Sequence, residues 1–306
     1  MSAGGVDRLA LGLAALGRPA YINLGRDGEL PAERTVDEMR AASWAVLDGA
    51  YAAGVRWVDV ARSYGRAEEF LAGWLAARGQ PELTVSSKWG YAYVGEWRMD
   101  AQVHELKEHS AARLREQYAE SRKLLGDRLD LYQVHSLTPD SPLFTDRELL
   151  GLLAELAESG PRLGFSTSGP NQADAIERAL ELGLFSAVQS TWNPLEPSAG
   201  DALAAAHAAG CHVIVKEALA NGRLVVTAPP AVDRLATEYG VGQDAVALAA
   251  ALAQPWADTV LLGPAGVGQL RANLAALDVP IDRAELADLA EDPADYWKQR
   301  SALAWN

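Results

Sequence analysis

Cysteine and long apolar runs are scarce in this 306-residue sequence. The single cysteine, Cys211, excludes an intramolecular disulfide, as is usual for proteins of the reducing cytoplasm. The longest uncharged apolar run, Ala245 to Ala253, is about half the ~18 residues that a membrane-spanning helix needs. The N-terminus has no basic segment followed by an apolar one, the pattern of a signal peptide. We therefore expect a cytoplasmic protein that does not span a membrane.

Basic residues are in the minority. The chain has 27 lysine and arginine residues against 41 aspartate and glutamate residues, which gives a formal net charge of −14 at pH 7. Such a surface repels the phosphates of nucleic acids and of anionic membranes, so neither is an expected partner. We expect a small-molecule partner instead. The sequence leaves open whether the protein is a monomer or a homo-oligomer.

Two common nucleotide-binding motifs are absent. The sequence has no Gly-x-Gly-x-x-Gly after its first predicted strand and no Gly-x-x-x-x-Gly-Lys. Their absence counts against an open, doubly wound sheet. What the chain does have is alternation. Short apolar runs predict strands at 9–13, 55–60, 83–87, 129–134, 162–165, 185–189, 212–215 and 259–262, and amphipathic runs predict helices at 35–53, 67–77, 101–125, 146–157, 171–182, 199–209, 231–239, 244–253 and 267–277.

Strict alternation of strands and helices implies a parallel sheet, because parallel strands need crossover connections. Eight units in about 280 residues match the usual size of a (β/α)8 TIM barrel, an α/β fold. No linker or low-complexity tract interrupts the chain, so we expect one barrel domain over 1–306. The segment 280–306 lies beyond the last unit and carries Tyr296, Trp297 and Trp305, which indicates a tail packed near the barrel.

Ionisable residues stand at the ends of three consecutive predicted strands. Asp59, Lys88 and His135 close strands two, three and four, and Tyr64 follows in the loop after Asp59. Active sites of such barrels lie at this edge. Lysine is the most informative of these residue types, because the chain has only five lysines and two of them, Lys88 and Lys216, end predicted strands. Each residue alone has a structural explanation, but together they favour a site.

The chemistry follows from the residue types. A phenol is a weak acid with a pKa near 10, and an adjacent ammonium is expected to lower that pKa. An aspartate would hold the ammonium in place, and a histidine would polarise a carbonyl oxygen. None of these groups donates hydride, so a cofactor must supply it.

The run Asp59-x-x-x-x-Tyr64-Gly65, with Lys88 and His135, resembles the catalytic tetrad of the aldo-keto reductases. Three further stretches are similar to the family's motifs: 164–167, 189–195 and 263–273. The resemblance spans nearly the whole chain. It implies that Tyr64 gives a proton to the substrate oxygen, that Asp59 and Lys88 tune it, and that His135 orients the carbonyl.

The resemblance also implies a nicotinamide cofactor, with NADP(H) preferred and NAD(H) as the second choice. The cofactor-binding residues it implies lie at the carboxamide, at the pyrophosphate loop and at the adenine end, and Arg271 is a candidate partner of a 2′-phosphate. They are Ser166, Thr167 and Gln189, then Glu217, Leu219, Ala220 and Asn221, then Gln269 and Asn273.

Three residues depart from the family pattern. Thr167 stands where asparagine is usual, and Trp192 stands where tyrosine is usual. Lys216 stands where many members have an aromatic residue that stacks on the nicotinamide. We expect the Lys216 ammonium to approach the cofactor, with a carboxylate ion pair as the alternative.

Trp89 and Trp192 fall at the expected catalytic face and are the candidate substrate-binding residues. Their aromatic faces suit sugars as well as aromatic carbonyls, so the expected reaction is reduction of an aldehyde or ketone, or oxidation of the corresponding alcohol or aldose. Two alternatives stay open: a non-catalytic barrel that binds the cofactor as a sensor or regulatory subunit, and a Schiff-base aldolase with Lys88 or Lys216 as nucleophile.

Overall fold

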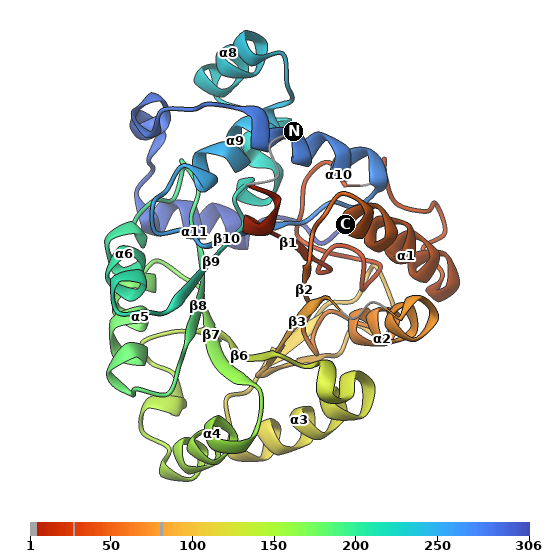
Figure 1. Ribbon diagram of the computed structural model, residues 1–306, viewed down its shortest axis with the longest axis vertical. Helices are drawn as coiled ribbons and strands as arrows, with labels where there is room; N and C mark the ends of the chain where they lie inside the picture. The colour runs from red at the N-terminus through yellow and green to blue at the C-terminus, as the bar shows by residue number, and fades with distance from the viewer. Residues whose placement is uncertain (1–4, 27, 80–81) are drawn as a thin grey trace.

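The structure is a closed barrel of eight parallel strands surrounded by helices (Figure 1). This computed structural model describes residues 5–26, 28–79 and 82–306. The order of the strands around the barrel is β1-β10-β9-β8-β7-β6-β3-β2. The predicted (β/α)8 fold is confirmed. Residues 1–4, on which part of the signal-peptide prediction rests, lie outside the described residues.

The barrel strands match the eight predicted ones within a few residues. Their bounds are β1 Leu9–Gly12, β2 Trp57–Asp59, β3 Thr84–Trp89, β6 Leu131–Leu137, β7 Arg162–Thr167, β8 Ala187–Thr191, β9 His212–Lys216 and β10 Thr259–Leu262.

The helices pack around the strands. Most match predicted helices closely, with one exception described below, whereas the helices at 223–226 and 293–301 were not predicted. The bounds of the helices are α1 Val36–Ala52, α2 Ala67–Arg78, α3 Ala111–Leu125, α4 Arg147–Ser159, α5 Gln172–Glu181, α6 Gly200–Ala208, α7 Arg223–Val226, α8 Pro230–Tyr239, α9 Gln243–Leu252, α10 Val267–Leu274 and α11 Pro293–Ser301.

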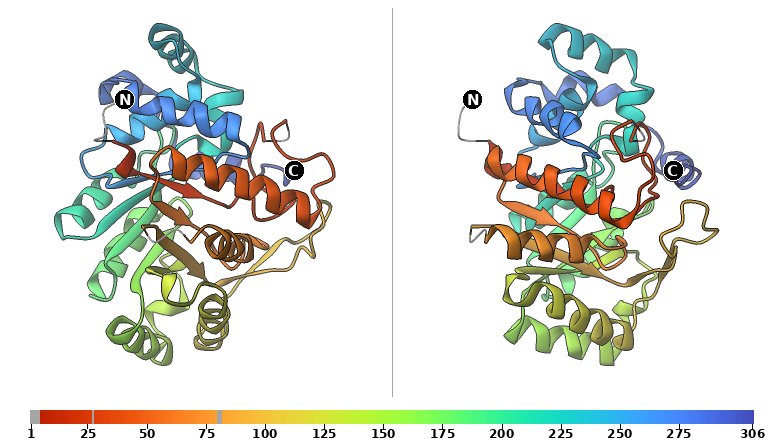
Figure 2. Two further views of the ribbon diagram at one scale, coloured as in Figure 1. Left: turned by 45° about the vertical axis from the view of Figure 1, so that its right-hand side comes forward. Right: turned by 90° about the vertical axis from the view of Figure 1, so that its right-hand side faces the viewer.

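The prediction of one long helix over 101–125 is wrong. Residues 105–107 form strand β5 (Glu105–Lys107), which pairs antiparallel with β4 (Tyr91–Tyr93). Helix α3 begins only after Ser110, whose side chain accepts a hydrogen bond from the Arg113 backbone N–H. The β4–β5 hairpin and the C-terminus lie at the same end of the barrel, opposite the N-terminus (Figure 2).

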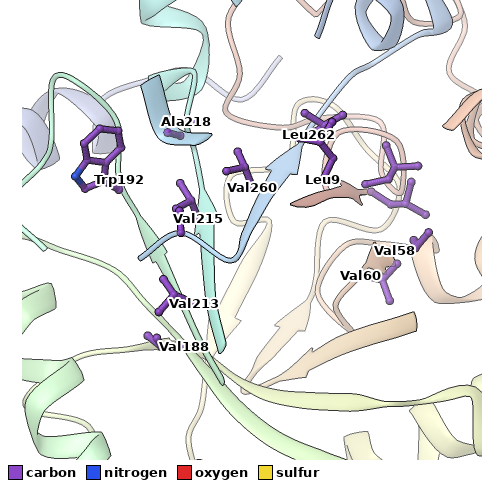
Figure 3. Packing of buried hydrophobic residues seen from close by; sticks show 14 of the residues in the cluster. Leu9, Val58, Val60, Val188, Trp192, Val213, Val215, Ala218, Val260 and Leu262 are labelled. Carbon is purple, nitrogen blue, oxygen red and sulfur yellow. The ribbon is translucent and has the colours of Figure 1, made fainter. Parts of the chain in front are cut away.

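The direction of each strand side chain follows the two-residue period of a strand. In β9, Val213 and Val215 are fully buried on the helix-facing side (Figure 3), whereas Ile214 packs inside the barrel with Leu131 and Ala187. Lys216 is two residues beyond Ile214, so it shares the inward direction. The same alternation decides which side chains reach the mouth of the barrel on every strand.

Candidate active site

A cavity of about 340 Å³ opens at the C-terminal ends of the strands. Tyr64, His135, Gln189 and Lys216 line it, with Asp59 at its floor. Its size and its mixture of aromatic and polar walls are typical of a small-molecule site. Asp59, Tyr64 and His135 of the sequence candidates thus meet at this cavity, and Lys88 lies behind its wall in contact with Asp59 and Tyr64.

Asp59 and Lys88 form a buried ion pair beneath Tyr64. The Lys88 ammonium donates to the Asp59 carboxylate and, at 3.1 Å, to the Val60 carbonyl oxygen. It also lies 3.5 Å from the Tyr64 phenol oxygen, to which it donates. Three partners account for the three ammonium protons, and the Tyr64 hydroxyl proton remains available to a ligand.

The expected lowering of the Tyr64 pKa is wrong for this structure. Burial and the Asp59 carboxylate hold the pKa of Tyr64 well above 10, although the Arg18 guanidinium opposes them. Burial is the largest cause, and the Asp59 carboxylate, which pairs with Lys88, adds to it. Tyr64 is therefore a neutral phenol at physiological pH, the form that a proton donor needs.

His135 lies between two tyrosines. Its ring centroid is 5.5 Å from that of Tyr64 and 5.1 Å from that of Tyr91, and its Nδ1 lies 3.4 Å from the Ser63 hydroxyl. Burial, with the charges of Lys88 and Lys216, holds the pKa of His135 well below 6.5. The ring is accordingly neutral and can donate one hydrogen bond to a ligand oxygen.

Five of the predicted cofactor residues line the cavity: Gln189, Lys216, Glu217, Leu219 and Asn221. The Gln189 amide donates to the Asp59 carboxylate at 3.2 Å. The Asn221 amide donates to the Ile22 carbonyl oxygen at 3.0 Å, but its buried Oδ1 has no hydrogen-bond partner among the described residues. An unsatisfied buried oxygen at a cavity wall fits a ligand that carries a donor.

The structure does not place the other predicted cofactor residues on the cavity wall; they are Ser166, Thr167, Ala220, Gln269 and Asn273. Ser166 accepts a hydrogen bond from the Ser136 backbone N–H at 2.8 Å. Thr167 points outward, because it follows inward-facing Ser166, and its hydroxyl bonds to Gln172 and Ser190.

Gln269 and Asn273 lie on α10 and bond to protein groups. The Gln269 amide donates to the Gly25 carbonyl oxygen at 3.1 Å, and the Asn273 amide donates to the Asp244 carboxylate at 2.7 Å. Through this bond Gln269 connects the start of α10 to the loop after β1. Part of its hydrogen-bonding capacity is therefore used by the protein itself.

The placement of Trp89 and Trp192 as substrate contacts is contradicted by their directions. Trp89 follows inward-facing Lys88, so its ring turns outward, where it is 1 % exposed and lies 5.8 Å from the His109 ring. Trp192 follows inward-facing Thr191 and packs against Trp256 among the buried hydrophobic residues (Figure 3).

Lys216 belongs to a cluster of three charges. Its ammonium donates to the Thr191 hydroxyl at 2.7 Å and lies 3.9 Å from the Glu217 carboxylate. Arg300 of α11 also donates two hydrogen bonds to the Glu217 carboxylate, from Nε at 2.9 Å and from Nη2 at 2.5 Å. Two cations thus share one carboxylate, which leaves one positive charge at the cavity wall.

The pKa values agree with this description. Burial opposes ionisation of Glu217, but Arg300 and Lys216 outweigh it and lower the pKa to about 2. Burial lowers the pKa of Lys216 to about 8, against the opposing effect of Glu217. An additional anion near Lys216 would stabilise its charged form.

The cavity wall also includes residues that are not among the sequence candidates, such as Arg18 and Glu105. The Arg18 guanidinium lies 5.1 Å from the Tyr64 ring centroid and 4.9 Å from that of Trp305, and it pairs with Glu105 at 2.6 Å. Arg18 comes from the loop after β1, and Glu105 comes from the β4–β5 hairpin. Arg18 and Glu105 lie in segments without a strand-end pattern, so local sequence patterns do not select them.

The described residues include no helix long and apolar enough to cross a membrane. Within the same residues, no group of three or more histidine, cysteine, aspartate or glutamate side chains is arranged to hold a metal ion.

The chain is thus a parallel (β/α)8 barrel whose mouth carries a tyrosine, a buried lysine–aspartate pair and a histidine. This combination is typical of barrel oxidoreductases. The sequence pattern of the Aldo/keto reductase family matches residues 8–291, so the chain belongs to that family. Members of the family generally use nicotinamide cofactors.

Individual relatives are more distant. "Aldo-keto reductase str7" of Strobilurus tenacellus is 31 % identical over 153 residues, which are 49 % of this chain and 40 % of that protein. The crystal structure of PA4992 from Pseudomonas aeruginosa, provisionally described as an aldo-keto reductase, is 26 % identical with a TM-score of 0.63 and covers 89 % of this chain and 90 % of its own. The holo form of aldo-keto reductase AKR11C1 from Bacillus halodurans shares the fold, with 22 % identity and a TM-score of 0.69. The match covers 93 % of this chain and 92 % of that one.

Proposed function

We propose that this protein is a nicotinamide-dependent oxidoreductase that reduces an aldehyde or ketone, or oxidises the corresponding alcohol or aldose. The observation that carries the proposal is the Tyr64 phenol, which accepts a hydrogen bond from the buried Lys88 ammonium and faces the cavity beside neutral His135. A neutral phenol and a neutral imidazole can both donate to one carbonyl oxygen.

In this proposal a bound nicotinamide cofactor would supply the hydride, and Tyr64 delivers a proton to the substrate oxygen. His135 donates a hydrogen bond to the same oxygen and fixes its direction. Lys88, with Asp59 as its counter-ion, stabilises the phenolate that remains after proton transfer. In the oxidation direction the same phenolate accepts the proton.

The cofactor is proposed to lie along the cavity wall formed by β8, β9 and the loop after β9. Gln189 and Asn221 offer amide groups there, and the buried Asn221 Oδ1 fits a donor of the cofactor. Lys216 supplies a positive charge for the pyrophosphate. Ser166, Thr167, Ala220, Gln269 and Asn273 would reach the cofactor only through their backbone or after side-chain rearrangement.

We also propose a preference for NADP(H) over NAD(H). Two side chains of opposite charge at helix α10 would influence this preference. Arg271 is exposed on α10 and favours a 2′-phosphate. Glu29 lies against Gly266 and Gly268 at the start of the same helix, so close that a side chain added at Gly266 would clash with its carboxylate. A carboxylate there disfavours a phosphate and accepts hydrogen bonds from ribose hydroxyls.

We further propose a cytoplasmic location, because the only cysteine is a buried free thiol that needs no oxidising compartment.

A substrate panel tests the proposed activity. Aldehydes, ketones, alcohols and aldoses are incubated with the reduced or oxidised form of each nicotinamide cofactor, and nicotinamide absorbance is followed. Turnover of at least one carbonyl–alcohol pair is the expected result. Tight cofactor binding without turnover of any member would instead support the non-catalytic sensor.

A further inference from the structure

The peptide bond that follows His135 leaves the regular ladder between β6 and β7. These strands pair in register up to Val134 and Phe165, and the register shifts before Leu137 pairs with Thr167. Ser136 has a φ of 55°, in the left-handed region. Such a bulge re-aims side chains next to active sites and leaves backbone groups without their ladder partners.

Two side chains replace those partners. The carbonyl oxygen of His135 lies 2.8 Å from Nε2 of His109, and the N–H of Ser136 donates to the Ser166 hydroxyl at 2.8 Å. The peptide unit between His135 and Ser136 is therefore held at both its oxygen and its nitrogen.

The bonding of His109 defines its tautomer. A carbonyl oxygen only accepts, so Nε2 of His109 must carry the proton. In the neutral ring Nδ1 then carries no proton, so the Ser141 hydroxyl, 2.8 Å away, donates to Nδ1 while it accepts from the Leu143 backbone N–H. Burial, with the charge of Lys107, lowers the pKa of His109 to about 4, so the neutral ring that this arrangement requires persists at neutral pH.

The His109 ring is also held by packing. It is 5 % exposed, and the Trp89 ring lies 5.8 Å away. Gly90 has a φ of 106°, and a Cβ placed there would come within 2.6 Å of the His109 ring. A residue with a side chain at position 90 would displace His109, so the glycine lets the ring approach the backbone closely.

We propose that His109 is a positioning residue that aims the His135 ring at the substrate oxygen by holding the peptide carbonyl of His135. The link to substrate rests on the proposed function, whereas the hydrogen bond to the peptide does not. His109 does not line the cavity, so it acts through His135 rather than on the substrate directly.

Two variants that differ only in reach test this role. In His109→Gln, the amide nitrogen takes the place of Nε2 and can still donate to the His135 carbonyl. In His109→Asn, the amide can reach Ser141 but falls short of His135. We expect His109→Gln to keep kcat within about threefold and His109→Asn to lower kcat about 10- to 100-fold, since a small misplacement can cost up to ~10² in rate. KM for the carbonyl and the Kd of the cofactor should change less than kcat.

A matched control comes from a histidine remote from the cavity. Nε2 of His212 lies 2.8 Å from the Thr259 hydroxyl, at the opposite end of β9 from Lys216. His212→Asn also removes a histidine contact, but it should leave kcat near the wild-type value. Equal kcat values for His109→Gln and His109→Asn, or an equal loss in His212→Asn, would overturn the proposal.

A spectroscopic measurement separates this inference from the proposed function. In the ¹⁵N–¹H spectrum of the full chain, His109 should show a protonated Nε2 and a bare Nδ1, and the His135 ring signals should shift in His109→Asn but not in His109→Gln. These signals can be read even if no carbonyl substrate is turned over. A protonated Nδ1 on His109, or unmoved His135 signals in His109→Asn, would contradict the role.

Discussion

At the scale of single residues, the hydroxyl of Tyr64 should decide turnover. Tyr64→Phe keeps the ring that packs beside His135 but removes the proton donor. We expect cofactor affinity to be retained and the rate to fall about 10²- to 10⁴-fold, the usual contribution of a general acid. Steady-state kinetics on the best substrate of the panel measures this loss.

Tyr91 provides the matched control for that prediction. It also lines the cavity, and its ring centroid lies 5.1 Å from that of His135. Tyr91→Phe makes the same chemical change without touching the Lys88 hydrogen bond and should keep most of the activity. Retention of more than about half the activity in Tyr64→Phe would show that Tyr64 is not the proton donor.

Glu29 should influence which cofactor is preferred. Glu29→Gln removes a negative charge beside the N-terminus of α10, where a phosphate is otherwise favoured. We expect the affinity for NADP(H) to rise relative to that for NAD(H). Titration of both cofactors against tryptophan fluorescence gives the ratio of the two dissociation constants, and an unchanged ratio would show that Glu29 lies away from the 2′ position.

The side-chain directions of the strand residues at the site can be predicted from the sequence. Lys88 and Thr191 point inward, so Trp89 and Trp192, one residue later, must point outward by the two-residue period of a strand. Position after a strand alone places both tryptophans at the catalytic face, whereas the alternation turns them away from it. Arg18 is different, because only the folded loop after β1 brings it to Tyr64.

At the scale of elements, strands and helices with strong periodicity were predictable and the hairpin was not. The eight barrel strands and the cores of their crossover helices follow local apolar patterns. Strands β4 and β5 are three residues each, and their pairing depends on contacts between residues 91–93 and 105–107 that no local pattern reveals. The N-cap Ser110 was a readable signal that the helix begins later than 101.

The end of β9 and helix α11 meet at Lys216, and the prediction for this lysine belongs to both elements. Lys216→Met removes the extra positive charge that remains after Glu217 and Arg300 pair. We expect cofactor binding to weaken by about 1.5–3 kcal/mol, the usual value for a hydrogen bond to a charged group. Without cofactor, thermal stability should change little or rise, because the low pKa of Lys216 shows that its charge is unfavourable there.

Arg300→Met is the comparison for that experiment, because it removes the other cation of the cluster and the ion pair between α11 and Glu217. It should lower the stability of the cofactor-free protein. If Lys216→Met instead leaves cofactor affinity unchanged and lowers stability as Arg300→Met does, the lysine is a structural partner of Glu217.

At the scale of the whole molecule, the partly buried Glu217–Arg300 pair should contribute to acid stability. The pKa of Glu217 is about 2 in the folded protein against an ordinary value of 4.5, so the unfolded chain binds more protons between these values. The contribution of Glu217 is thus fully present above about pH 4.5 and is lost as the pH falls toward about 2. Urea unfolding of the cofactor-free protein at several pH values in this window should show stability falling more steeply in the wild type than in Glu217→Gln. In Arg300→Met the dependence should also become weaker, because the larger of the two cationic effects that lower the Glu217 pKa is gone. A wild-type slope in both variants would show that other carboxylates dominate acid unfolding.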